Sequence, residues 1–174
     1  NNPLVGVLAG AIITAVIQSS AASIGILQSL SITGHITYGM AIPIIMGQNI
    51  GTCVTALISS IGVNRSARRV AVIHIAFNCI GTIILLPILY LVNAFVDFVF
   101  MDWTISYAGI ALVHTIFNVV VTFLLLPFSK LLEKLAYLVI KQLPEETQKE
   151  QLILKASYSD DCKPHRYNPV NTKG

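Results

Sequence analysis

The first 64 residues of the chain contain no Asp, Glu, Lys or Arg. They form apolar runs that only short clusters of uncharged polar residues interrupt. Over the whole chain 55% of the residues are hydrophobic and 11% are charged, whereas soluble domains average about 25% charged residues. Such a long stretch without charge is typical of a chain that lies within a lipid bilayer. We therefore predict an all-α integral membrane protein.

The first polar cluster, residues 18–23, reads Gln-Ser-Ser-Ala-Ala-Ser and lies between the apolar runs 4–17 and 24–30. Hydroxyl and amide groups at membrane depth need hydrogen-bond partners, so such a cluster indicates a site rather than a surface. Each flanking run is shorter than the about 20 residues that a helix needs to cross a bilayer. Two interpretations remain open: a re-entrant hairpin broken at the cluster, or one helix over about 4–30.

The second polar cluster, residues 47–52, reads Gly-Gln-Asn-Ile-Gly-Thr. It follows an apolar run that contains Pro43, and the apolar run 54–61 comes after it. Glycine adopts backbone conformations that are forbidden to other residues in a helix interior. We therefore predict a second broken helix here, after a loop at 31–39.

Two later runs, 70–92 and 104–128, are long enough to span a membrane. The loop 93–103 between them contains two aspartates and no basic residue. Basic residues flank the other ends of both spans, in a predicted loop at 62–69 and after residue 129: Arg65, Arg68, Arg69, Lys130, Lys134 and Lys141. Basic flanks are typical of the cytoplasmic side. We therefore predict that the three arginines set the topology and that the C-terminus is cytoplasmic.

The chain divides into three predicted parts. Residues 1–128 form a transmembrane repeat. Residues 129–151 form an amphipathic helix and linker at the cytoplasmic surface, because leucines alternate there with charged residues at helical spacing. Residues 152–174 lack any periodicity, and we predict that they are disordered.

His74 and Asn78 are four residues apart, and His114 and Asn118 repeat the same spacing forty residues later. Each pair shares one face of its predicted helix. The pairs could line a path or relay protons. Interhelical hydrogen bonds that fix the packing are the favoured interpretation, because neither pair includes a carboxylate.

The chemistry of the two clusters is that of ion binding. A break in a membrane helix frees carbonyl oxygens, which together with serine hydroxyls suit Na⁺, and a helix N-terminus whose amides suit an anion. A seam of small residues between packed helices is the alternative. The sequence offers no set of nucleophile, base and acid and no metal cluster, so we do not predict an enzyme. The net charge of +3 belongs to loops and tail, so nucleic-acid binding is not predicted either.

Gln-Ser-Ser at 18–20, the glycine-bracketed motif at 47–52 and His-x-x-Phe-Asn at 74–78 resemble the sodium/phosphate cotransporter family of type II, found in bacteria and animals. That family has two inverted repeats. Each repeat carries a Gln-Ser-Ser-Ser element and a Gly-x-Asn-Ile-Gly-Thr element, and the two serine elements meet in the centre. The chain resembles the second repeat of a bacterial member. It departs from the family pattern at Ala21, which replaces the third serine, and at Gln48, which replaces a small residue.

The resemblance implies one half of an inverted-repeat transporter in the bacterial inner membrane. It implies sodium-coupled import of inorganic phosphate by alternating access, with Na⁺ as coupling ion and no other cofactor. The partners would be phosphate, sodium ions, membrane lipid, and the missing first repeat or another copy. A non-transporting anchor or regulatory subunit, a carrier of another small anion and a passive channel are the alternatives. The predicted binding residues, of which Ser19 and Ser20 would hold Na⁺, are Gln18, Ser19, Ser20, Ser23, Gln48, Asn49 and Thr52.

Overall fold

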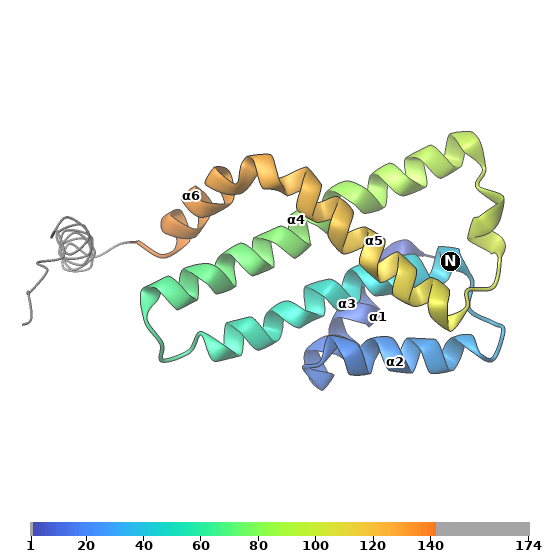
Figure 1. Cartoon of the computed structure of the whole chain (residues 1–174), viewed down its shortest axis with the longest axis horizontal. Coiled ribbons are helices and arrows are strands. Elements are labelled where there is room, and N and C mark those ends of the chain that lie inside the picture. The colour runs from blue at the N-terminus through green and yellow to red at the C-terminus, as the bar shows by residue number, and fades with distance from the viewer. Residues whose placement is uncertain (1, 142–174) are drawn as a thin grey trace, which may run out of the picture. The chain divides into compact units, whose positions relative to one another are not determined.

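The computed structural model describes residues 2–141 (Figure 1). Its regular elements are helices, as predicted, and one isolated antiparallel bridge joins Thr37 to Thr104. In chain order the elements are α1 (Pro3–Ile17), α2 (Ser20–Ser31), α3 (Tyr38–Ser59), α4 (Arg65–Val96), η1 (Val99–Asp102), α5 (Tyr107–Leu125), η2 (Leu126–Phe128) and α6 (Ser129–Val139).

Three described helical segments are long and apolar enough to cross a membrane: Tyr38–Ser59, Arg65–Val96 and Tyr107–Val139. We predicted two full-length spans, so α3 is an addition to them. At 15 residues, α1 is shorter than a span. In Figure 1, α3 lies beside the first half of α4, and α5 crosses both helices.

The first polar cluster breaks the helix, which confirms the broken-helix interpretation against a single helix. Gln18 adopts the left-handed conformation, with φ of 57°, and its N–H donates to the Thr14 carbonyl at 2.7 Å. Ser19 is extended, and its hydroxyl accepts a hydrogen bond from the Ala22 N–H at 3.3 Å. A left-handed C-terminal residue followed by a serine N-cap ends one helix and begins the next within two residues.

The predicted break in the second polar cluster is wrong, because α3 runs through it without interruption. Its glycines serve close packing instead. A Cβ atom added at Gly47 would overlap the Val7 carbonyl oxygen of α1, and one added at Gly51 would lie 2.5 Å from the Ala11 oxygen. Gly10 on α1 meets the α3 backbone in the same way. Small residues thus let two membrane helices approach backbone to backbone.

The predicted arginine loop is also shorter than expected. Asn64 caps α4 by accepting the Ala67 N–H at 2.9 Å, so all three arginines lie in the first turns of α4. Arg69 is only 6% exposed. Its Nε donates to the Ile140 carbonyl at 3.1 Å, and its guanidinium lies 4.5 Å from the ring centre of Tyr137. Arg69 therefore fastens the end of α6 to α4, which is more than the topological role that we predicted.

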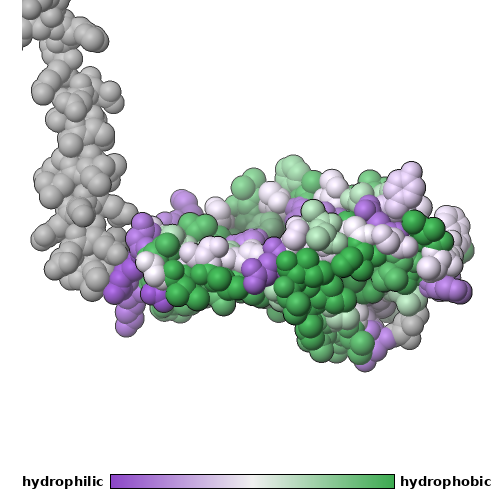
Figure 2. Space-filling model, turned by 90° about the horizontal axis from the view of Figure 1, so that it is seen from below, coloured by the Kyte–Doolittle hydropathy of each residue, from purple (hydrophilic) through white to green (hydrophobic). Residues whose placement is uncertain are grey.

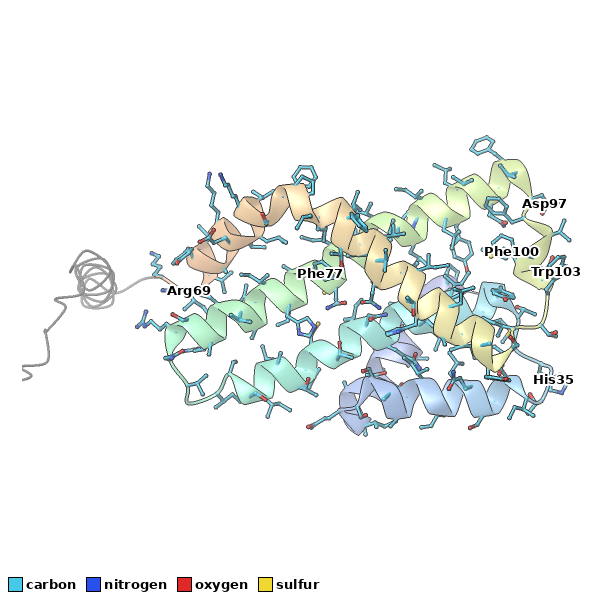
Figure 3. The ribbon with its side chains drawn as sticks, viewed as in Figure 1. His35, Arg69, Phe77, Asp97, Phe100 and Trp103 are labelled. Carbon is cyan, nitrogen blue, oxygen red and sulfur yellow. The ribbon has the colours of Figure 1, made fainter. Side chains whose placement is uncertain are left out.

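The second predicted span begins later than expected, at Tyr107, and turns into α6 through η2, which contains Pro127. Of α6, Leu132 and Ala136 are buried. The rest of the predicted linker, residues 142–151, and the predicted disordered tail, residues 152–174, lie outside the described residues. At the other end of α4, Asp97 and Trp103 lie far from Arg69 (Figure 3).

Two apolar clusters hold the helices together. The larger joins α3, α4, α5, α6 and η1 through Ile42, Met46, Leu86, Met101, Phe117, Val121, Leu125 and Leu132. The smaller joins α2, α3 and α5 through Leu27, Ala41, Ile45, Ile105 and Ile110. Many large apolar side chains remain exposed, and Figure 2 shows continuous hydrophobic areas on one face of the molecule. Surfaces of this kind face lipid in membrane proteins.

Candidate ion-binding site

A buried polar cluster lies where the break between α1 and α2 meets α3. The Thr14 hydroxyl, at the end of α1, donates to the Ser23 hydroxyl of α2 at 2.7 Å. From the middle of α3, Gln48 Nε2 donates to the same hydroxyl at 2.9 Å and to the Ser23 carbonyl at 3.0 Å. The three residues are 0%, 1% and 3% exposed, respectively. The glycine contacts between α1 and α3 bring these groups within reach of one another.

The Gln48 side chain has an unused acceptor. Its amide nitrogen donates to two Ser23 oxygens, and one of these is a carbonyl that can only accept, which fixes the orientation of the amide. Within residues 2–141, its Oε1 is buried and has no hydrogen-bond partner. A buried acceptor without a partner costs about 1–3 kcal/mol. The cluster therefore offers a neutral oxygen that a cation or an O–H donor would satisfy.

Asn49, the next residue on α3, belongs to a second polar contact. Its Oδ1 accepts a hydrogen bond from Asn118 Nδ2 of α5 at 3.2 Å, and its own Nδ2 donates to the Ile45 carbonyl at 2.9 Å. Asn118 also donates to the His114 carbonyl at 2.8 Å and lies 3.3 Å from the His114 ring nitrogen Nε2. Asn118 thus links α5 to α3.

The other predicted pair makes a similar contact on α4. Asn78 Nδ2 donates to the His74 carbonyl at 3.0 Å and lies 3.5 Å from the Cys53 sulfur of α3. Both asparagines therefore connect neighbouring helices, as the packing interpretation requires.

The other predicted site residues do not join the buried cluster. Gln18 is exposed at the break, the Ser19 hydroxyl caps α2, and Ser20 is half-buried at the first position of α2. The Thr52 hydroxyl donates to the Asn49 carbonyl within α3 at 2.5 Å. Of the predicted residues, Ser23 and Gln48 lie in the buried cluster and Gln18, Ser19 and Ser20 lie at the break, whereas Asn49 and Thr52 make other contacts of α3.

Thr14 is not among the predicted site residues, although it is fully buried in the cluster. Its one signal is position, since it lies one helical turn before Gln18. In the described part of the chain, no group of three or more His, Cys, Asp or Glu residues could hold a metal ion. The oxygens that the cluster itself offers, from two hydroxyls and one amide, are neutral.

Comparison with known proteins supports the resemblance. The chain is 38% identical over 90 residues to "Uncharacterized protein YqeW" of Bacillus subtilis, which covers 52% of this chain and 29% of that protein. It is 38% identical over 94 residues to human sodium-dependent phosphate transport protein 2B, covering 51% and 14%. It is 31% identical over 88 residues to "Putative inorganic phosphate export protein YjbB" of Escherichia coli, covering 51% and 16%.

The aligned stretches span less than a third of each of these relatives. No solved structure matches the chain. The sequence profile of the Na⁺/Pi-cotransporter family matches residues 1–129, which include both polar clusters and the three apolar spans up to the end of η2. The chain therefore belongs to the Na⁺/Pi-cotransporter family.

Proposed function

We propose that the chain supplies half of the site through which a secondary transporter moves phosphate together with Na⁺ by alternating access. The observation that carries the proposal is the buried Thr14–Ser23–Gln48 cluster beside a helix break, with one amide oxygen unsatisfied. Interrupted helices with polar ends are how secondary transporters build sites within the membrane.

The two sides of the break suit opposite charges. The first N–H groups of α2 have no partners within the helix, and the helix dipole makes that end partly positive, so it suits an oxyanion. The Gln48 oxygen suits a cation. Since Gln48 contacts Ser23 in the first turn of α2, the two functions meet at that turn. We keep Ser19 and Ser20 as proposed ligands of phosphate or Na⁺, together with Gln18, Asn49 and Thr52.

A complete site needs a second half, because each cluster occurs once in this chain. An inverted first repeat or a second copy would supply it. We propose import across the bacterial inner membrane, with the basic ends of α4 and α6 and the C-terminus in the cytoplasm. The name of the relative YjbB makes export the rival direction.

The test is phosphate flux in proteoliposomes. The protein is purified together with the copies or repeat that accompany it, and radioactive phosphate is followed under an inward or an outward Na⁺ gradient. Accumulation driven by the inward gradient is expected. Ser20→Ala should reduce it at least tenfold. The matched control is Ser29→Ala on the same helix, because this exposed serine bonds only to the Gly25 carbonyl of its own helix.

Each alternative has its own result. Flux that continues after the Na⁺ gradient is collapsed would indicate a passive channel. Accumulation of another oxyanion in preference to phosphate would change the substrate. No flux with both halves present would support the anchor or regulatory role.

A further inference from the structure

A second concave region lies away from the ion-binding cluster, between α4 and the bend from α5 into α6. It has a volume of about 620 Å³ and is lined almost entirely by apolar side chains. Ile84 comes from α4, Phe128 from η2, and Leu131 and Leu135 from α6. Lys134 of α6 is the basic residue of this lining. We call this region the α4–α6 groove.

The groove has a fixed wall because α6 is fastened to α4 along its other side. Ala136 is buried against the protein, Leu132 is buried at the edge of the groove that it also lines, and the contacts of Arg69 with the end of α6 hold its last turn. The apolar face of α6 that lines the groove stays open, with Leu131 63% and Leu138 74% exposed.

The helix α6 and the first turns of α4 carry a positive net charge. The first turns of α4 and the helix α6 contain five basic residues and one acidic residue, whereas Asp97 and Asp102 follow the other end of α4. Arg69 is engaged in packing, but Lys134 and Lys130 are exposed on α6. Of these two lysines, Lys134 lines the groove and Lys130 does not.

We infer that the α4–α6 groove binds one anionic phospholipid, with an acyl chain along its apolar wall and the headgroup phosphate at Lys134. The acyl chains of any lipid can cover the apolar wall equally well, so the wall does not choose between lipids. A lipid with net negative charge gains in addition from Lys134 at the groove, and the about 1 kcal/mol expected for one nearby basic residue is about fivefold in affinity. This inference does not depend on the proposed transport.

The chain contains a single tryptophan, Trp103, which lies near Asp97 and far from the basic end (Figure 3). This permits a fluorescence test on the full chain in phosphatidylcholine bilayers. In a Trp103→Phe background, Phe128→Trp places the indole in the groove. Phosphatidylglycerol brominated on its acyl chains then replaces phosphatidylcholine stepwise. We expect quenching to saturate at about one fifth of the lipid fraction that brominated phosphatidylcholine needs.

Lys134→Gln should remove this preference for phosphatidylglycerol, and the matched control Lys130→Gln should retain most of it. Unaltered Trp103 should show no preference. As a check without substitution at Phe128, phosphatidylglycerol should raise the melting temperature in detergent more than phosphatidylcholine does, and Lys134→Gln should abolish the difference. The inference is overturned if both lipids quench the groove indole equally, if Lys134→Gln leaves the preference intact, or if neither lipid quenches because another protein surface covers the groove.

Discussion

Replacing Gln48 by leucine separates the role of its amide in folding from its role in ion binding. The substitution removes two hydrogen bonds to Ser23. Hydrogen bonds between membrane helices average about 0.6 kcal/mol, so their loss costs roughly 1–2 kcal/mol. The same substitution also removes the unsatisfied Oε1, which relieves about 1–3 kcal/mol. Leucine fills a similar volume, so the two effects nearly cancel, and stability without Na⁺ should change by no more than about 1 kcal/mol.

The response to Na⁺ should change far more. A ligand that binds only the folded protein at ten times its dissociation constant stabilises it by about 1.4 kcal/mol, which corresponds to roughly 3–6 °C for a chain of this size. If Gln48 Oε1 meets Na⁺, Gln48→Leu should lose most of that shift. The measurement is the melting temperature in NaCl against choline chloride at equal ionic strength.

Gln28→Leu is the matched control for this substitution. Gln28 also donates one hydrogen bond to a neighbouring helix, to the Tyr107 carbonyl at 2.9 Å. It lies in the second half of α2, away from the break. This variant should keep the full Na⁺ shift. The reasoning is refuted if Gln48→Leu keeps the shift, or if it loses more than about 3 kcal/mol in choline chloride, because the amide would then be a packing group.

Two further predictions concern packing. Gly47→Ala should destabilise the protein by about 1–3 kcal/mol, because the added methyl group overlaps the α1 backbone. Gly25 has open space around it, so Gly25→Ala should be neutral or stabilising by up to about 1 kcal/mol. The measurement is the free energy of unfolding of both variants in detergent. Arg69→Ala should release the end of α6 and speed its cleavage by protease severalfold, because the last turn loses a hydrogen bond and a cation–π contact. Arg68→Ala, at an exposed position, should leave the cleavage rate unchanged.

The sequence left the break at Gln18 open against a single helix, and the structure decides for the break. The local signal is Ser19, a residue type that can cap the following helix, whereas glutamine rarely adopts the left-handed conformation that Gln18 has here. The predicted helix break in the second polar cluster was wrong because glycine has two uses in membrane helices. It permits unusual backbone conformations, and it permits close helix contacts. Only the position of α1, which contacts α3 at Gly47 and Gly51, decides between these uses.

The contact of Thr14 with Ser23 and the burial of Arg69 could not be predicted either, because both depend on how the helices pack. Thr14 reaches Ser23 only because the chain reverses at the break, and Arg69 meets Ile140 across 71 positions of sequence. The positions of the basic residues in the sequence predict which end of a helix is charged. It does not predict which of several arginines turns inward.

The two departures from the family pattern have different consequences for the site. Ala21 replaces the third serine of the family element, and Ser23 follows it by two residues. In the structure Ala21 is exposed and Ser23 is fully buried, because residues two positions apart point about 200° apart on a helix. Ser23 therefore cannot place its hydroxyl where a serine at 21 would place it. An anion at the open end of the break would meet one hydroxyl fewer, while Gln48 adds an amide oxygen on the buried side. If the proposed site is correct, the two departures shift its ligand chemistry from the oxyanion toward the cation.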